Sequence, residues 1–518
     1  MSASGDVIRA TYLITAPAGE AAAAARRIAY EQTVELPEAL VTDAAILEGV
    51  VGRVEDVTPC AGHDERHLAT IAYPCAAFDA QFPALLNLVF GNASLLAGTR
   101  LVDVDLPAAV LSQFQGPNHG ATGLRALLGV HGRALLATAL KPRGRDAREL
   151  AALAGAFARG GGDIVKDDQN LADDFETFKR RALRCRDAVA DANAASGRNC
   201  LYLPHASARY DDLERCFEFA AASGIPGLLV CPMIVGLETL RTLAARYPLV
   251  VMAHPALTSV AGGTAARGLA PPLLWGTLFR LAGADIAIFP HPGGRFPFTA
   301  DDGAATAAAL RAPLGELAAA LPAPAGGMTL ERVPELCATY GVDAVHLVGG
   351  ALFGLDNDIA VATRRFLDAI RAASDERLVP PQPLPAPARG YHLAAGADFN
   401  WAGRESSPYK HAEDAAFRGV RRVELVGRFG EPTRTDLRYF EVEPGGYSSF
   451  EQHVHGHIVI AGRGRGVLVQ GGERRALEVN DVAFIAPLEA HQLRNESDQP
   501  FGFFCIVDRR RDRPLPAG

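Results

Sequence analysis

One short run of this sequence places a lysine, two carboxylates and an amide directly after an apolar, strand-like stretch: Lys166-Asp167-Asp168-Gln169. Such a cluster at a strand end is either a structural ion-pair network or part of a catalytic site, and the run alone leaves both open. A second lysine, Lys141, ends the preceding strand-like stretch. Two lysines at adjacent strand ends crowd positive charge, which lowers the pKa of one and suits a base acting next to a carbonyl group.

A second group of candidate ligands lies near the C-terminus, in a strand-like stretch that runs from residue 451 to residue 457. Alternation along a strand would place its carboxylate and its three imidazoles on one face, where they would be good ligands for a first-row transition metal. Either His455 or His457 could instead face solvent, and a polar strand without a metal remains the alternative. The candidate ligands are Glu451, His453, His455, His457 and His491.

Composition narrows the class of protein. The chain has 518 residues, more than one core usually holds, and 49% of them are hydrophobic, which excludes a disordered chain. The formal net charge is −8 and no basic stripe is evident, so we expect no nucleic-acid partner. No apolar run approaches the roughly 20 residues that span a bilayer, and no signal peptide is recognisable. Eight scattered cysteines suggest reduced thiols, so we expect a cytoplasmic protein without a membrane partner.

The middle of the chain alternates short apolar runs with amphipathic helical stretches. This pattern predicts parallel βαβ units, and eight strands close a (β/α)8 TIM barrel, in which residues just past the strand ends build the active site. The expected strands are Leu136–Leu140, Ile164–Val165, Leu201–Leu203, Leu228–Val230, Val250–Met252, Ile286–Phe289, a weaker one near Leu321, and Ala344–Val348.

Different patterns flank this barrel region. Before it, two strand-like and two helical stretches predict a small α+β domain; after it, the proline-rich run Val379–Ala388 predicts an extended linker, and short strands with turn glycines predict an all-β domain. The expected fold is therefore α/β multidomain. The expected divisions are an α+β domain at 1–110, a TIM barrel at 111–378, a linker at 379–392 and an all-β domain at 393–518.

Several of these runs together resemble the large subunit of ribulose-bisphosphate carboxylase (RuBisCO), over roughly residues 6–375. They are Phe114-Gln115-Gly116-Pro117-Asn118-His119-Gly120, Lys141-Pro142, the run around Lys166, His254, two glycine pairs, Glu31 and Gly91-Asn92. The resemblance implies a ferredoxin-like N-terminal domain before the barrel. It also implies that Lys166 is carbamylated by CO2 and binds Mg²⁺ with Asp168, that Lys141 moves the proton next to the ketone, and that His254 is catalytic.

The resemblance also implies how the substrate is held. Glu31 and Asn92 would reach in from a neighbouring subunit, which implies a homodimer with a shared active site. The phosphate of a sugar phosphate would lie against glycines, as is common in barrels. The substrate-binding residues that follow from the resemblance are Glu31, Asn92, Arg295, Gly326, Gly327, Gly349 and Gly350.

Three departures distinguish this chain from the carboxylase. Gln169 stands where the carboxylase has a metal-ligand glutamate, and a neutral amide holds Mg²⁺ more weakly. Pro255 replaces an arginine for a second phosphate, and Pro290–Arg295 replaces the loop that brings a lysine over CO2. These features resemble the type IV, RuBisCO-like proteins, whose known reactions begin by enolising a phosphorylated ketose without fixing CO2.

The C-terminal stretch resembles the cupins, and within them stand-alone members linked to methylthio-sugar metabolism. This implies a cupin barrel holding Mn²⁺, Fe²⁺, Ni²⁺ or Zn²⁺. The combined hypothesis is a methionine-salvage enzyme whose barrel isomerises 5-methylthioribulose 1-phosphate and whose cupin assists loss of methanethiol from the product. The alternatives are a decarboxylase of a keto-acid sugar phosphate, such as 3-oxo-isoapionate 4-phosphate, and a sugar-phosphate-binding protein without catalysis.

Overall fold

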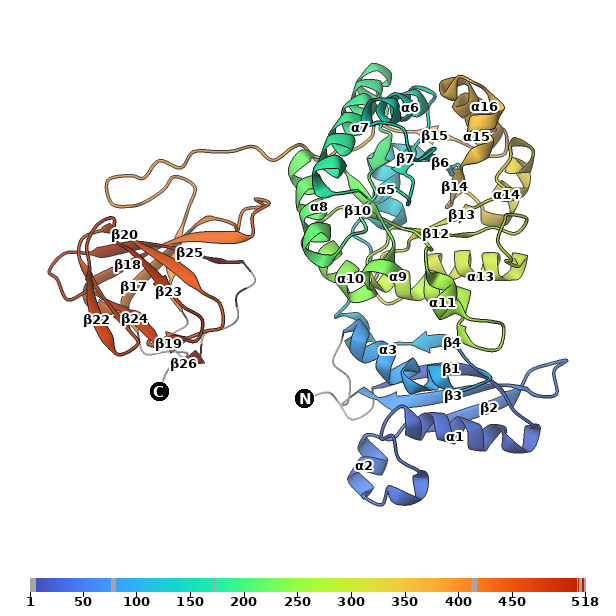
Figure 1. Cartoon of the computed structure of the whole chain (residues 1–518), viewed down its shortest axis with the longest axis horizontal. Helices are drawn as coiled ribbons and strands as arrows, with labels where there is room; N and C mark the ends of the chain where they lie inside the picture. Colours follow the sequence, from blue (N-terminus) through green and yellow to red (C-terminus); the bar gives the residue numbers. More distant parts are fainter. Residues whose placement is uncertain are drawn as a thin grey trace. The chain divides into compact units, whose positions relative to one another are not determined.

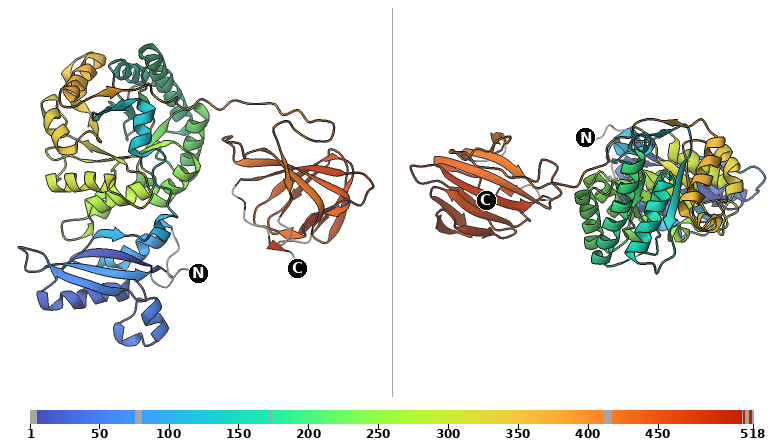
Figure 2. Two further views of the ribbon diagram at one scale, coloured as in Figure 1. Left: turned by 180° about the vertical axis from the view of Figure 1, so that it is seen from behind. Right: turned by 90° about the horizontal axis from the view of Figure 1, so that it is seen from above.

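The computed structural model describes residues 6–75, 81–171, 173–410, 417–509, 511 and 515–516. The chain forms two compact units, residues 1–387 and residues 388–518 (Figures 1 and 2). The division falls inside the proline-rich segment. The first part of that segment packs on the first unit, where Gln382 N–H donates to the carbonyl of Ala126 and Asn199 donates to the carbonyl of Gln382.

The first unit begins with a sheet domain, drawn in blue in Figure 1. Its antiparallel strands follow the spatial order β4-β1-β3-β2, with β11 from the barrel region added beside β4. The succession of strands and helices along the chain, with this order, is the predicted ferredoxin-like arrangement. Its elements are β1 Val7–Thr15, η1 Ala18–Glu20, α1 Ala21–Glu31, η2 Glu38–Leu40, α2 Ala44–Gly49, β2 Arg53–Pro59, β3 Arg66–Pro74, α3 Phe82–Phe90, η4 Asn92–Leu95 and β4 Thr99–Asp105.

Eight parallel strands form the predicted barrel, in the order β8-β7-β6-β14-β13-β12-β10-β9. A bridge between His205 and Leu229 joins the two ends of this order and closes the barrel. Each strand comes within a few residues of its expected place. The strands are β6 Leu135–Leu140, β7 Ile164–Asp167, β8 Leu201–Leu203, β9 Gly227–Val230, β10 Val250–Ala253, β12 Ile286–Pro290, β13 Leu321–Ala325 and β14 Val345–Val348.

Helices surround the barrel strands, and aspartate or threonine side chains cap several of their first turns, as at Asp146, Asp174 and Asp358. In the described part of the chain, no helix is long and apolar enough to cross a membrane. The remaining elements of this unit are α4 Ala108–Leu111, α5 Gly120–Leu128, β5 Val130–His131, α6 Ala147–Arg159, α7 Phe175–Ser196, α8 Tyr210–Ser223, α9 Pro232–Val235, α10 Leu237–Arg246, α11 Thr258–Gly262, β11 Gly268–Leu269, η5 Pro272–Leu278, α12 Phe279–Leu281, α13 Ala300–Arg311, η6 Leu330–Arg332, α14 Val333–Tyr340, α15 Gly350–Leu355, α16 Ile359–Ala372 and β15 Arg377–Leu378.

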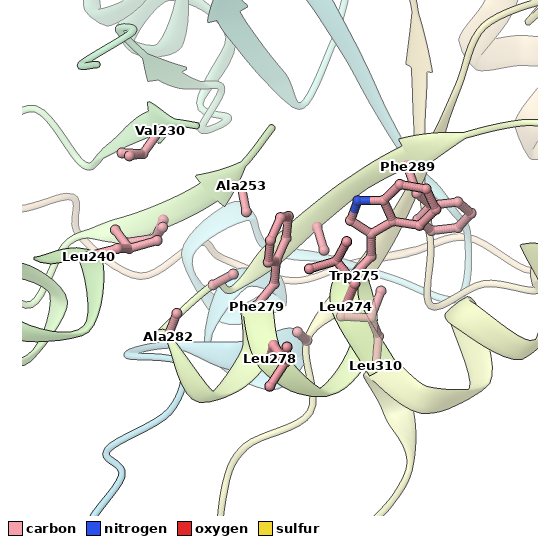
Figure 3. Packing of buried hydrophobic residues seen from close by; sticks show 14 of the residues in the cluster. Val230, Leu240, Ala253, Leu274, Trp275, Leu278, Phe279, Ala282, Phe289 and Leu310 are labelled. Atoms are coloured by element: carbon pink, nitrogen blue, oxygen red, sulfur yellow. The ribbon is translucent and has the colours of Figure 1, made fainter. Parts of the chain in front are cut away.

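Two layers of apolar side chains stabilise the barrel. One fills its interior, where alternate strand residues such as Ile164, Val250 and Leu321 are fully buried and Leu124 of α5 joins them. The other lies between strands and helices; Figure 3 shows part of it, with Leu278 and Phe279 among residues from neighbouring strands and helices. Because strand side chains alternate in direction, most strands contribute to both layers.

His346 on β14 belongs to the outer layer, yet neither of its ring nitrogens has a hydrogen-bond partner among the described residues. Its neighbours Val345 and Leu347 face the barrel interior, so its imidazole faces the helices. Burial, followed by the nearby His291, lowers the pKa of His346 to about 4. The folded protein therefore keeps this imidazole neutral at pH values where the unfolded chain binds a proton.

We expect the folded state to lose stability as the pH falls below about 6.5, the ordinary histidine pKa, because protons then bind the unfolded chain preferentially. The loss attributable to His346 should reach roughly 2 kcal/mol at pH 5. His346→Leu should remove that part of the pH dependence. Urea unfolding at pH 7 and pH 5 measures it, with His63→Leu, at an exposed histidine, as the matched control. Equal losses in wild type and His346→Leu would contradict the explanation.

The second unit contains an eleven-stranded, mainly antiparallel sheet that forms the predicted all-β cupin fold (red and orange in Figure 1). Its interior is filled by side chains such as Phe440, Val459 and Phe501. The strands are β16 Ser406–Pro408, β17 Arg418–Val426, β18 Thr435–Tyr447, β19 Glu451–Gln452, β20 His457–Arg463, β21 Gly466–Gln470, β22 Glu473–Leu477, β23 Val482–Ile485, β24 His491–Arg494, β25 Phe501–Asp508 and β26 Leu515–Pro516.

Candidate functional site

The twofold alternation of the barrel strands aims the predicted catalytic side chains at one end of the barrel. On β7, Ile164 faces the barrel interior, so Lys166 and Asp168, two and four residues later, face the same side. The same alternation from the interior residue Met252 of β10 leads to His254. The local period of the strand therefore converts short sequence runs into a convergent site.

The charges of Lys141, Lys166 and Asp168 lie close enough at the adjacent strand ends to influence one another. Lys141 Nζ forms an ion pair with Asp168 Oδ2 at 2.6 Å, and Lys166 Nζ donates to the carbonyl of Asp167 at 3.1 Å. Burial, opposed by the charge of Asp168 and reinforced by that of Lys141, lowers the pKa of Lys166 to about 8. A lysine with this pKa has a substantial neutral fraction near pH 8, the form that reacts with CO2.

Asp167 points away from the cavity, and its carboxylate holds the end of β7 in place. Its buried carboxylate accepts hydrogen bonds from Arg181 Nε at 2.8 Å, from the Tyr202 hydroxyl at 2.9 Å and from the backbone N–H of His205 at 3.1 Å. This network joins β7, α7 and β8. Asp167 therefore fixes the strand end that carries Lys166, a role that the sequence run did not separate from that of Asp168.

His254 is held as a neutral imidazole. Burial, followed by the charge of Lys166, lowers the pKa of His254 to about 3. Its Nδ1 accepts a hydrogen bond from the backbone N–H of Ala256 at 3.1 Å. In the neutral ring the proton must then lie on Nε2, so His254 can donate a hydrogen bond to a ligand in the cavity.

One cavity of about 550 Å³ collects most of the predicted barrel residues at the ends of the strands. Apolar side chains such as Phe296 and Met328, which were not among the predicted site residues, also line it. Gly327, with a φ of +66°, lies so close to the backbone of Gly293 that a side chain would not fit. The predicted residues on this cavity are Lys141, Lys166, Gln169, His254, Arg295, Gly326, Gly327, Gly349 and Gly350.

Glu31 and Asn92 lie elsewhere, in the N-terminal domain. Asn92 Nδ2 donates to Glu31 Oε1 at 2.8 Å and also donates to Glu35. Neither Glu31 nor Asn92 lines the barrel cavity of its own chain. Within one chain, therefore, the structure brings these two residues to each other but not to the other predicted barrel residues.

The cupin histidines converge, although not in the way the sequence predicted. The expected continuous strand over residues 451–457 is wrong: β19 ends at Gln452, β20 begins at His457, and the chain bends between them. Ligand nitrogens of His453, His457 and His491 nevertheless lie within 4.8 Å of one another. His455 stacks on His453, with ring centroids 3.8 Å apart. The bend, rather than strand alternation, brings the first two of these ligands together.

Hydrogen bonds orient these three imidazoles for a metal ion. The Nδ1 atom of His453 bonds to the carbonyl of His455 at 2.6 Å, and that of His491 to the carbonyl of Glu489 at 3.0 Å. The Nδ1 atom of His457 contacts Cys505 Sγ at 3.2 Å, while its buried Nε2 has no hydrogen-bond partner among the described residues. With each Nδ1 engaged, the three Nε2 atoms are left for a metal, so this donor set fits a transition-metal ion.

Glu451 also faces the cupin cavity, but it is already paired. Its carboxylate forms an ion pair with Lys410 and accepts a 3.4 Å hydrogen bond from the Tyr409 hydroxyl. Sequence reasoning also missed Arg422, Arg438, Arg511 and Cys505, which line the same cavity of about 190 Å³. A signal was present for Arg422 and Arg438, because each lies two residues from an apolar interior residue of its strand and therefore faces the same side.

Family models match about two thirds of the chain, in three segments. The model for the ribulose bisphosphate carboxylase large chain, N-terminal domain, matches residues 2–110, and that for its catalytic domain matches residues 120–289. The cupin domain model matches residues 438–507. These segments coincide with the ferredoxin-like domain, with most of the barrel and with the core of the β unit.

Individual relatives are similar over the first unit. A protein from Rhodospirillum rubrum named 5-methylthioribulose-1-phosphate isomerase is 41% identical over 372 residues, 71% of this chain and 97% of the relative. One from Geobacillus kaustophilus named 2,3-diketo-5-methylthiopentyl-1-phosphate enolase is 34% identical over 312 residues, 60% of this chain and 76% of the relative. The crystal structure of a Rubisco-like protein from Rhodopseudomonas palustris is 39% identical, with a TM-score of 0.63, and covers 71% of this chain and 98% of its own. The chain thus belongs to the RuBisCO-like enzymes, the members of the RuBisCO large-chain family that are not carboxylases, and it carries a cupin domain after its barrel.

Proposed function

We propose that the barrel isomerises 5-methylthioribulose 1-phosphate in methionine salvage and that the cupin acts on the isomerised product. The observation that carries the proposal is the convergence of Lys141, Lys166 and His254 on one cavity that also has glycine backbone at its wall. The similarity to the Rhodospirillum rubrum 5-methylthioribulose-1-phosphate isomerase, which this chain covers almost completely, supports the choice of substrate.

In this proposal the barrel residues divide the work of enolisation. The Lys141 amine takes a proton from the carbon next to the ketone and returns it to the neighbouring carbon. The Nε2–H of His254 donates a hydrogen bond to a sugar oxygen, which a neutral imidazole does without adding charge. Backbone N–H groups of Gly326, Gly327 and the Gly349–Gly350 pair approach the phosphate closely, and Arg295 adds a positive charge at the same cavity.

The oxygen ligands available in the barrel fit Mg²⁺, although one of them, the neutral amide of Gln169, would bind the ion weakly. A carbamate on Lys166 and the carboxylate of Asp168 would hold the ion, and Gln169 would contribute a neutral oxygen. The ion would supply positive charge that stabilises the oxyanion of the enediolate. The ion pair with Lys141 and the binding of Mg²⁺ would compete for the carboxylate of Asp168. Binding of the ion by Asp168 would therefore release the Lys141 amine, which could then accept a proton.

Product analysis on the full-length protein tests the proposal. The purified chain, with Mg²⁺ and bicarbonate and with its metal content measured, is incubated with 5-methylthioribulose 1-phosphate and followed by NMR. We expect an isomerised sugar phosphate, followed by departure of the S-methyl group from the sugar. An unchanged substrate would refute the barrel function. Release of CO2 from keto-acid sugar phosphates would then favour the decarboxylase, and binding without turnover would favour a sugar-phosphate-binding protein.

We further propose a homodimer in which Glu31 and Asn92 complete the barrel site of the partner subunit. Their position outside their own chain's cavity, and the hydrogen bond between them, support this arrangement. Asn92→Ala should lower the isomerisation rate on the order of 100-fold, because a positioned donor is lost.

Complementation between two inactive variants tests the shared site. Lys166→Met damages the barrel half of the site and Asn92→Ala damages the other half. A co-expressed mixture should regain about a quarter of the wild-type activity, because half of the dimers are mixed and each mixed dimer has one intact site. Activity no higher than the sum of the two variants would show that the site is not shared.

A further inference from the structure

The cupin cavity is lined by several arginines in addition to the histidines of the metal site. On β17, Val420 packs into the cupin core, so alternation also turns Arg422 inward. On β18, the core residue Phe440 leads in the same way to Arg438, which lies two residues away. Both arginines line the histidine cavity, and Arg511 joins them.

Two of these three arginines lie beside a carboxylate, and the third does not. Arg511 pairs with Asp436 at 2.5 Å, and Arg422 Nε lies 3.3 Å from Glu424. Arg438 has no carboxylate partner among the described residues; its Nη2 donates to Cys505 Sγ at 3.2 Å, and its buried Nε has no hydrogen-bond partner there. The Nε of Arg422 is likewise buried without a hydrogen bond, despite the nearby carboxylate.

Mutual repulsion makes this cluster unfavourable without an anion. Burial, and also the charges of Arg438, Arg511 and Arg428, lower the pKa of Arg422, while the charge of Glu424 opposes the shift. A dication held by the three histidines would add further positive charge to the same cavity. A guanidinium group such as that of Arg438, which lacks a carboxylate partner and lies beside a metal site, is suited to bidentate recognition of a phosphate.

We propose that Arg438 and Arg422, with Arg511, form an anion site in the cupin that holds a phosphate monoester beside the histidine metal site. The cupin substrate is then a phosphorylated molecule, whose phosphate fixes its reacting carbon near the metal ligands. In identifying this molecule as the sugar phosphate released by the barrel, the inference rests on the proposed function. The anion site itself rests only on the cupin side chains.

Relaxation of ³¹P nuclei by Mn²⁺ tests the site directly. Full-length protein loaded with Mn²⁺ is titrated with inorganic phosphate and, separately, with ribulose 5-phosphate. The part of the relaxation that disappears in His457→Gln reports phosphate near the cupin metal rather than the barrel. We expect that part in wild type, and we expect Arg438→Gln and Arg422→Gln to bind roughly 10- to 100-fold more weakly. A stronger effect with the sugar phosphate than with inorganic phosphate identifies an ester as the ligand.

A matched control lies on the same strand. Arg421 is half-buried like Arg422 but pairs with Glu441 and does not line the cavity, so Arg421→Gln should bind as wild type does. Arg438→Lys should fall between wild type and Arg438→Gln, because it keeps the charge and loses the planar fork. Metal content and circular dichroism, measured for each variant, separate loss of the anion site from misfolding.

The outcomes separate this inference from the proposed function. Wild-type phosphate affinity in folded, metal-loaded Arg438→Gln and Arg422→Gln overturns the anion site. Phosphate binding that requires Arg438, without departure of the S-methyl group from the sugar, supports the anion site and rejects the proposed cupin reaction. Departure of that group at the same rate in wild type and Arg438→Gln rejects the anion site and supports the cupin reaction.

Discussion

Lys166→Met should lower the rate of isomerisation by about 1,000-fold, because it removes the group that holds the barrel metal and with it several kcal/mol of oxyanion stabilisation. Methionine suits this position, since the Lys166 side chain is almost fully buried and the replacement keeps its length and apolar stem. The isomerisation rate with saturating substrate, Mg²⁺ and bicarbonate, followed by NMR, measures the effect.

A readout independent of catalysis accompanies this variant. The chain has only four lysines, Lys141, Lys166, Lys179 and Lys410, so a carbamate formed from ¹³C-bicarbonate can be assigned by substitution. We expect a carbamate resonance in wild type and in Lys179→Met, a control on α7 whose amine pairs with Glu176. Lys166→Met should lack the resonance. A carbamate that persists in Lys166→Met, or full activity of that variant, would show that Lys166 does not have the proposed role.

Replacing one cupin histidine should separate the two halves of the enzyme. His457→Gln is expected to lower transition-metal affinity on the order of 100-fold or more, because it removes one of three convergent ligands. Departure of the S-methyl group should stop, while isomerisation by the barrel continues at the wild-type rate. Metal analysis after dialysis, together with the two NMR readouts, measures both effects.

His455→Gln is the matched control for this prediction. His455 belongs to the same histidine run, but its ring stacks on His453 and lies outside the group of three convergent ligands. We expect this variant to keep its metal. Metal loss in His455→Gln equal to that in His457→Gln would make His455 a ligand and would require a different arrangement of the bend. Loss of isomerisation in His457→Gln would contradict the independence of the barrel reaction.

Much of the barrel half could be predicted because strand alternation is a local property. Once Ile164 is placed in the interior, Lys166 and Asp168 must share its direction and Asp167 must oppose it. The same reasoning applies to Lys141 and His254. What the sequence did not indicate was the partner of Asp167, because Arg181 is 14 residues away on a helix whose packing against β7 is a tertiary contact.

The cupin half was predicted less well. The histidine run does supply metal ligands, but strand alternation was the wrong reason, because the chain bends after His453. The third ligand, His491, comes from β24, and only strand pairing across the sheet brings it to the others. Arg422 and Arg438 were missed although their parity with Val420 and Phe440 was visible, because a charged residue at an interior position acquires meaning only when the cavity beside it is known.

The sequence by itself therefore determined the order of domains, the eight barrel strands and the residue types at the strand ends. These follow from hydrophobic periodicity and from short motifs, which depend on neighbours along the chain. Only the tertiary structure decided that Asp167 pairs with Arg181, that three of the histidines converge, and that Arg438 has no carboxylate partner within the described chain. Such facts depend on distances between residues far apart in sequence, and packing of the whole fold sets those distances.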